Sequence, residues 1–255
     1  MLTFLGTGDS MGVPRVYCDC TTCTEARVSG VNNRLRSSVL IEVTGDEPFM
    51  IDCGPDWRKQ MEGCGLRNID HILITHAHFD HIGGLPEWAD ACRWQTKKGN
   101  LYAAPEVILL IHIMFPWLTN QLNYHSITQP FRFASWLVEG WRVNHGKNGY
   151  AYAFRFSKAG KHWVYCPDSI DLLGEEKIRL FGLDLLILGT SFYQEPFEKY
   201  TRSVYDMVEA LELIAEIQAN RVYFTHMSHN INLQNKYPLP KSILLATTGM
   251  KVALW

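Results

Sequence analysis

The 255-residue sequence lacks a long apolar stretch, a large excess of one charge and an even number of cysteines. Its longest apolar run, residues 107–115, is interrupted by His112 and is too short to cross a bilayer. Residues 1–6 contain no basic or extended apolar leader, so we expect a cytoplasmic protein with no membrane partner. With 24 basic and 26 acidic residues, the net charge of −2 creates no general attraction to nucleic acid, which argues against such a partner.

The seven cysteines are not arranged as a disulfide framework, because their number is odd and four of them stand far apart. The sequence also lacks internal repeats, low-complexity segments and linkers. Apolar residues make up 47% of the chain, which is enough to build one large core. We therefore expect one domain over residues 1–255, with a loop insertion near residues 14–36.

Short apolar or alternating segments predict a protein of the α/β class. Helical periodicity is clearest over residues 203–218, and helices are also expected over residues 83–93 and 105–115. The predicted strands cover residues 2–5, 38–43, 49–51, 69–75, 101–104, 137–143, 150–156, 162–166, 183–188, 222–225 and 250–255. Strands come first in pairs and then alternate with helices, which indicates sheets covered by helices. Residues 116–130 show no readable pattern.

Four metal-capable side chains occur within six residues, directly after a predicted buried strand: His76, His78, Asp80 and His81. A loop that leaves a strand can direct several side chains to one point, and imidazole and carboxylate suit zinc, manganese or iron. The alternative is four solvated loop residues, which such a density of ligands disfavours. Each pair of ligands needs a distant third residue to complete its metal site.

A second cluster, Cys18, Cys20 and Cys23, supplies three thiolates near the N-terminus. A structural zinc site needs four sulfur or nitrogen ligands, so one more must come from elsewhere. His229 is the best candidate, because it lies three residues after another candidate ligand, His226. The alternative is three free or buried thiols. A zinc here would order the polar segment of residues 14–36.

The run from His76 to His81 has the pattern His-X-His-X-Asp-His, which resembles the signature of the metallo-β-lactamase superfamily. The resemblance implies a four-layer αββα sandwich with two catalytic divalent metals, zinc or manganese, at one edge of the sheets. It places Asp52 behind the metals as a supporting residue. The ligands that it implies are His76, His78 and His145 for one metal, Asp80, His81 and His226 for the other, and Asp168 as the bridge.

The cysteine cluster, the opening Gly6-Thr7-Gly8 and the segment of residues 34–38 resemble the PhnP group of that superfamily. This implies a phosphodiesterase that acts on a small or cyclic phosphodiester. Water held between the two metals is expected to have a lowered pKa and to act as the nucleophile. The wider group includes tRNA-processing endonucleases and PqqB-like proteins. The chain lacks the basic, glycine-rich insertion of the tRNA enzymes.

The leaving oxygen of a phosphodiester needs a proton or a positive charge, and the PhnP group is thought to provide it from a histidine. At that position this chain has no histidine between Glu198 and Ser203. We expect Arg202 or Tyr200 to supply this charge or proton. Asp80 is the third expected catalytic residue, as a metal ligand. The alternative for Arg202 is a solvent-exposed residue at the start of a helix.

Two other functions fit the same ligands. The first is hydrolysis of an ester, thioester or lactone, and the second is a non-catalytic, PqqB-like accessory role. Substrate specificity is expected from residues 117–136 and from Asp56, Trp57 and Arg58. The expected partner is a small phosphodiester, and the resemblance makes a homodimer the candidate assembly.

Overall fold

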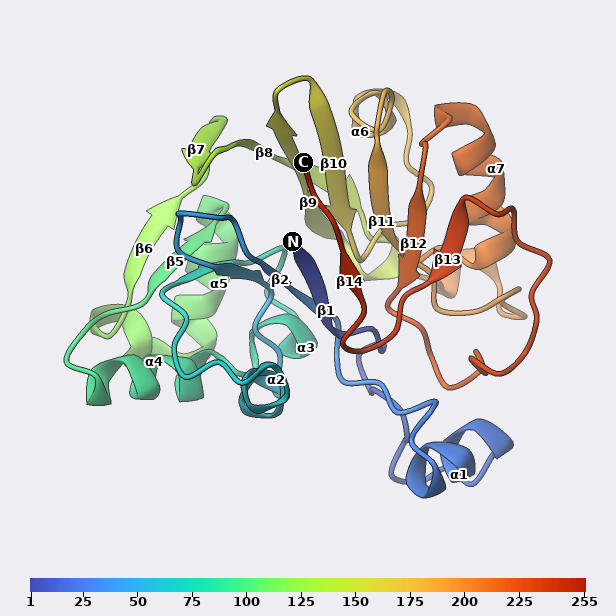
Figure 1. Cartoon of the computed structure of the whole chain (residues 1–255), viewed down its shortest axis with the longest axis horizontal. Helices are drawn as coiled ribbons and strands as arrows, with labels where there is room; N and C mark the ends of the chain where they lie inside the picture. Colours follow the sequence, from blue (N-terminus) through green and yellow to red (C-terminus); the bar gives the residue numbers. More distant parts are fainter.

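Two seven-stranded sheets lie against each other in this computed structural model, which describes residues 1–255 (Figure 1). The first sheet has the order β14-β1-β2-β3-β4-β5-β6, and the second has the order β13-β12-β11-β10-β9-β8-β7. The strands of the first sheet are β1 (Leu2–Gly6), β2 (Ser38–Ile41), β3 (Phe49–Ile51), β4 (His71–Leu73), β5 (Asn100–Ala103), β6 (Asn123–Ser126) and β14 (Lys251–Val252). Those of the second are β7 (Phe131–Phe133), β8 (Trp136–Asn144), β9 (Tyr150–Lys158), β10 (Lys161–Cys166), β11 (Leu185–Gly189), β12 (Val222–Thr225) and β13 (Ile243–Leu245).

Strand alternation sorts the apolar side chains into layers, because successive residues of a strand point to opposite faces. In β2, Val39 and Ile41 belong to the core between the sheets, whereas Leu40 packs outward against helices. The core between the sheets also contains Phe156 and Trp163, whose rings stack with centroids 4.0 Å apart. Both sheets therefore bury both of their faces.

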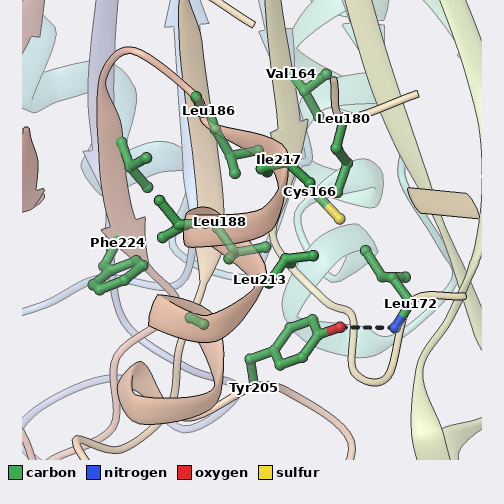
Figure 2. Packing of buried hydrophobic residues seen from close by; sticks show 14 of the residues in the cluster. Val164, Cys166, Leu172, Leu180, Leu186, Leu188, Tyr205, Leu213, Ile217 and Phe224 are labelled. Carbon is green, nitrogen blue, oxygen red and sulfur yellow. Dashed lines mark hydrogen bonds between the residues drawn. The ribbon is translucent and has the colours of Figure 1, made fainter. Parts of the chain in front are cut away.

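Helices cover the two outer faces of the paired sheets (Figure 1). On the first sheet these are α2 (Trp57–Cys64), α4 (Leu85–Trp94) and α5 (Pro105–Met114); on the second they are α6 (Gly174–Ile178) and α7 (Met207–Ile217). Figure 2 shows Leu213 and Ile217 of α7 packed near Leu186 and Leu188 of β11. The predicted four-layer αββα sandwich is confirmed. The remaining short helices are α1 (Thr21–Val28), α3 (Phe79–Ile82), η1 (Pro116–Asn120), η2 (Gly146–Asn148) and η3 (Lys199–Thr201).

The helix predicted over residues 203–218 begins later, at Met207. Asp206 caps it, since the Asp206 carboxylate accepts the Glu209 N–H at 2.9 Å and Glu209 accepts the Asp206 N–H at 3.4 Å. The residues before the cap are drawn into another contact, in which the Tyr205 N–H donates to the Ser169 carbonyl. The helix therefore begins where the capping box places it, and not where the apolar periodicity begins.

Several elements were absent from the sequence prediction. Strand β6 lies at the edge of the first sheet with mostly exposed side chains, so it has no apolar alternation to detect. Helix α1 lies within the segment that was predicted as a loop, and η1 lies in the unreadable region. The last strand is shorter than predicted, because only Lys251 and Val252 pair with β1.

No helix in the structure combines the length and the apolar character that crossing a membrane requires. The cytoplasmic location, the single-domain organisation and the homodimer stay predictions.

Candidate metal centre

The metal-capable side chains gather at one edge of the two sheets, just beyond the ends of four strands. His76 follows β4, and His145 follows β8. Asp168 follows β10, and His226 follows β12. Strands of both sheets end at this edge, so residues far apart in the sequence meet there. Glycine at position 189, next to the Asp168 loop, is required, because a Cβ atom there would lie 1.6 Å from the Pro167 carbonyl oxygen.

Three imidazoles form a first possible ligand set. The His76 Nε2 lies 2.8 Å from the His78 Nδ1, and the His145 Nε2 lies 3.4 Å from that same nitrogen. The His145 Nδ1–H donates to the Ser203 carbonyl at 2.7 Å, which directs the lone pair of Nε2 into the group. These three nitrogens could hold one metal ion.

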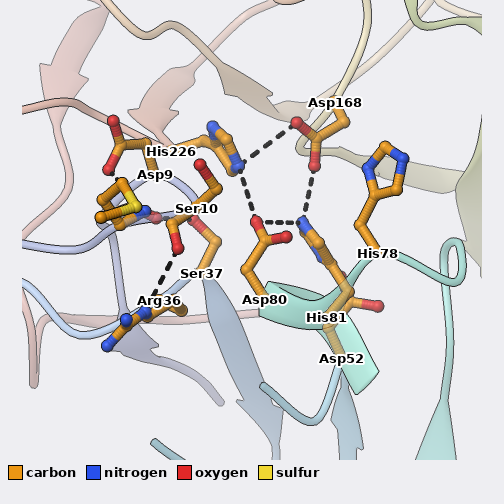
Figure 3. Close-up of polar contacts among 12 residues, drawn as sticks. Asp9, Ser10, Arg36, Ser37, Asp52, His78, Asp80, His81, Asp168 and His226 are labelled. Carbon is orange, nitrogen blue, oxygen red and sulfur yellow. Dashed lines mark hydrogen bonds and ion pairs between the residues drawn. The ribbon is translucent and has the colours of Figure 1, made fainter. Parts of the chain in front are cut away.

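Asp80, His81 and His226 form a second possible set (Figure 3). Asp80 Oδ2 lies 3.1 Å from His81 Nε2 and 3.4 Å from His226 Nε2. Asp168 closes the ring, with its oxygens 2.8 Å from His81 Nε2 and 3.2 Å from His226 Nε2. The same carboxylate lies 3.9 Å from the His76 Nε2 of the first set. Asp168 therefore stands between the two sets, where a bridging ligand would lie.

Orphaned polar atoms indicate that these sets suit metal ions. The His81 Nε2 and the Asp168 Oδ2 are both buried and lack a hydrogen bond, although they lie only 2.8 Å apart. The Nδ1–H of His81 is already donated to Asp52, so a neutral His81 ring presents only a lone pair at Nε2 and cannot donate to Asp168. Burying two such atoms without a partner is costly, and a divalent cation between them removes that cost.

Metal binding requires neutral imidazoles and ionised carboxylates. Burial lowers the pKa of His76, His78 and His145 below the usual value, so these rings are neutral at neutral pH. Burial also opposes the charged forms of His81, His226 and Asp168, but the attraction between these rings and the nearby carboxylates outweighs it, raising the pKa of both histidines and holding that of Asp168 well below its usual range. A metal at the second set would therefore displace the protons of these two rings.

Asp52 supports the second set from behind. Its Oδ2 accepts the His81 Nδ1–H at 2.8 Å, and its Oδ1 accepts the Thr75 N–H at 2.8 Å. The Asp52 backbone is left-handed, with φ of 65°, a conformation that aspartate tolerates better than most residues. The next turn requires glycine at position 54, since a Cβ atom there would lie 2.1 Å from the Asp80 carbonyl oxygen.

The Asp52→Asn variant is expected to bind metal at the second set about 10 to 100 times more weakly, because the orientation of His81 loses its charged acceptor. Competition with a metal-sensitive chelator would measure this. Asp46→Asn, on an exposed turn, is the matched control. Unchanged metal affinity in Asp52→Asn would contradict the supporting role.

Cys18, Cys20, Cys23 and His229 also meet. The three sulfurs lie 3.3, 3.5 and 3.5 Å from the His229 Nδ1. Tetrahedral zinc with ordinary Zn–S and Zn–N bonds places sulfur and nitrogen ligands about 3.5 Å apart. The spacing therefore fits a structural zinc.

The early segment is also attached to the loop after β12 through Arg34, which is almost fully buried. Its guanidinium donates to the carbonyls of Ser228 at 2.9 Å and Ile231 at 2.8 Å. Since His226 and His229 lie in or next to this loop, one segment connects the cysteine cluster to the metal centre.

Of the two predicted proton donors, Arg202 lines the cavity beside the candidate metal ligands and Tyr200 does not. The Tyr200 side chain is 82% exposed and does not line the cavity beside the metal ligands. The alternative for Arg202, a solvent-exposed residue at the start of a helix, is wrong: its side chain is buried, and Glu209 accepts two hydrogen bonds from it, at 2.6 and 3.0 Å. Asp206 accepts a third at 3.2 Å. The Arg202 guanidinium therefore anchors the loop before α7.

A cavity of about 190 Å³ opens on the metal ligands, and the sequence did not single out most of its other walls. Lys147, in η2, is its only cation without a carboxylate within 4.0 Å. Its N–H donates to the Arg202 carbonyl at 3.1 Å, which fixes η2 against the opposite loop. The only feature of the sequence that pointed to Lys147 was its closeness to His145 in the chain. The further lining residues include Ser10, Asn148, Ser191, Phe192, Glu195, Thr201, Ser203 and Val204.

The residues from which specificity was expected lie elsewhere. None of residues 117–136 lines this cavity, nor do Asp56, Trp57 and Arg58. Trp57 is buried under the first sheet, Asp56 pairs with Arg36, and Arg58 pairs with Glu87. These side chains stabilise the fold instead of forming the cavity wall.

Comparison with known proteins gives a consistent result. Residues 48–227 match the family described as "Beta-lactamase superfamily domain". The crystal structure of "a New Diphosphatase from the PhnP Family" superposes with a TM-score of 0.86 and 28% sequence identity, covering 98% of this chain and 95% of that one.

Two curated relatives are longer proteins. The octanoyltransferase of Porphyromonas gingivalis is 29% identical over 247 residues, which cover 91% of this chain and 47% of that protein. Ribonuclease Z of Methanococcus maripaludis is 31% identical over 134 residues, which cover 51% of this chain and 35% of that protein. The chain thus spans about half the length of the first relative, and the aligned part of the second is shorter still.

Proposed function

This chain belongs to the metallo-β-lactamase superfamily, and from that membership we propose that it is a metal-dependent phosphodiesterase acting on a small or cyclic phosphodiester. The observation that carries the proposal is Asp168, held between two sets of ligands that could each take a divalent metal. The PhnP-family neighbour and the ribonuclease Z relative support phosphate chemistry over the other reactions of the fold.

Two bound divalent metals, zinc or manganese, would lower the pKa of a water molecule and stabilise negative charge on phosphoryl oxygens. The chain's own residues arrange the site around that chemistry. Asp168 keeps the two ligand sets close together, and Ser203 and Asp52 orient the rings of His145 and His81. The polar walls of the cavity bind and orient an anionic substrate.

The Lys147→Ala variant is expected to raise KM roughly fivefold to tenfold with a smaller change in kcat, because a free ammonium beside the cavity attracts the substrate phosphate. The difference should shrink as salt is added. Steady-state kinetics at two ionic strengths would measure it. Lys241→Ala, exposed and outside the cavity, is the control. An unchanged KM would show that Lys147 does not contact the substrate.

The proposed function is tested with purified protein, manganese and bis-p-nitrophenyl phosphate. We expect turnover that depends on the metal and is absent from metal-free protein. A protein with both ligand sets loaded that shows no turnover above the metal-free background would contradict the proposal, and would favour the accessory role.

A second candidate is hydrolysis of an acyl ester or thioester, which is favoured by one observation: a relative that covers 91% of this chain is an octanoyltransferase. The cavity argues against it, since only Phe192 and Val204 among its 16 lining residues are hydrophobic. An octanoyl chain would find little apolar surface there. We therefore expect a higher kcat/KM for bis-p-nitrophenyl phosphate than for p-nitrophenyl octanoate, and the reverse order would favour the acyl reaction.

A further inference from the structure

Glu195 is a carboxylic acid in the wall of the cavity that contains the metal ligands. It lies in the loop between β11 and η3, and its side chain is only 11% exposed. The same cavity wall contains His78 and Asp168, so a substrate bound at the metal centre would also face Glu195. It lies a few residues before the segment where the sequence suggested a proton donor.

Carboxylates outnumber cations around Glu195; besides Arg202, the Lys199 ammonium lies 4.0 Å from Glu209. Three carboxylates, those of Glu195, Asp206 and Glu209, surround the single guanidinium of Arg202. Glu209 and Asp206 take the hydrogen bonds of the terminal nitrogens of Arg202. Glu195 forms an ion pair with the remaining Nε at 3.1 Å. Of the three carboxylates, Glu195 is the one that lines the cavity.

Burial raises the pKa of Glu195 above its usual value; Arg202 opposes this rise, and the negative charges of Asp206 and Glu209 add to it. A donor must be protonated, so a raised pKa increases its useful fraction at any given pH. That fraction falls as the pH rises through the pKa. Across the cavity, the other charged groups outside the metal ligands are Lys147 and Asp9.

The other acidic or basic walls of the cavity are less suitable as donors. Asp9 is paired with Arg15 at 2.6 Å and accepts the Met11 N–H, so both of its oxygens already have partners. Arg202 keeps its proton at any physiological pH. Lys147, in the middle of η2, is exposed. Among the acidic and basic residues of the cavity wall outside the metal ligands, this leaves the enclosed Glu195 as the candidate donor.

We propose that Glu195 is a catalytic residue that donates the proton to the leaving oxygen, an inference that rests on the proposed phosphodiesterase function. A water oxygen forms the new bond to phosphorus and releases a proton to solvent. The bond from phosphorus to the leaving oxygen breaks, and its electron pair stays on that oxygen. The Glu195 O–H supplies the proton that converts it to an alcohol, and solvent protonates the carboxylate again. Arg202 acts as a positioning residue that holds the Glu195 loop to α7.

The test compares two phosphodiesters of similar shape, bis-p-nitrophenyl phosphate and diphenyl phosphate. Nitrophenolate leaves readily without a proton, whereas phenolate, with a pKa of about 10, benefits from one. Glu195→Gln is expected to lower kcat for diphenyl phosphate on the order of a hundredfold and for the nitrophenyl ester less than about fivefold. We expect kcat of the unaltered protein for diphenyl phosphate to decline with rising pH. This decline should disappear in the variant.

Glu198→Gln, a nearby exposed glutamate outside the cavity, is the matched control and should behave like the unaltered protein. Glu195→Asp keeps an acid and should recover part of the diphenyl rate. Equal losses for both esters, or an unchanged pH profile, would overturn the role of Glu195 while leaving the phosphodiesterase function intact. If the unaltered, metal-loaded protein hydrolyses neither ester, the proposed function fails and this inference fails with it.

Discussion

The Asp168→Ala variant is expected to lose at least about a thousandfold in kcat/KM for bis-p-nitrophenyl phosphate. The Asp168 carboxylate is buried and lies within 4.0 Å of four imidazole nitrogens, those of His76, His81, His145 and His226. No other carboxylate reaches both ligand sets. Removing it leaves the two sets without a shared anion, so metals bound there would be held more weakly.

Metal content provides the second measurement for Asp168→Ala. We expect the variant to lose at least one metal from the centre while it keeps the zinc at Cys18, Cys20, Cys23 and His229, because that cluster makes no contact with Asp168. Asp46→Ala, on an exposed turn, is the control and should keep both activity and metals. An active Asp168→Ala protein with a full set of metals would contradict the proposed bridge.

Cys23→Ala is expected to release the zinc and to lower Tm by roughly 10 °C, which corresponds to about 3 kcal/mol for a chain of this size. The Cys23 sulfur is fully buried in α1 and lies 3.5 Å from the His229 Nδ1. Without zinc, the early segment keeps the Arg34 hydrogen bonds to the loop after β12, but α1 loses its link to that loop through Cys23. That loop also follows His226, so weaker metal binding at the catalytic centre should accompany the loss of stability.

Thermal unfolding and zinc analysis of the same samples would test this second prediction. Cys64→Ala is the matched control, since Cys64 is an exposed cysteine at the end of α2. It should keep the zinc and the Tm of the unaltered protein. A Cys23→Ala protein with unchanged zinc content and Tm would show that the cluster is a group of free thiols.

The main elements could be predicted because their burial is regular. Strand β12 (Val222–Thr225) was predicted with its observed bounds, as all four of its residues are buried between neighbouring strands. Some strands at the edge of a sheet were missed because their burial is not regular. In β6 the backbone pairs with β5, but most of its side chains are exposed, so pairing leaves no pattern in the sequence.

The candidate metal ligands could be proposed from the sequence because metal chemistry restricts the residue types. Histidine, cysteine and aspartate at close spacing, or directly after buried strands, are unusual enough to stand out, as in the run from His76 to His81. The proton donor is less restricted, because several residue types can supply a proton. Arg202 lies in the segment where the sequence predicts the proton donor, but three neighbouring carboxylates neutralise its positive charge.

The sequence by itself determined the class of fold and the residues able to bind metals, because burial periodicity and ligand chemistry are local properties. Only the tertiary structure decided which residues line the cavity beside the candidate metal ligands. Lys147 and Glu195 are ordinary residue types in loops, and nothing in their local sequence marks them. They become part of one cavity because β8 and β11 end at the same edge of the second sheet. A proton donor or a substrate cation is defined by proximity and by uncompensated charge, and both depend on packing between distant segments.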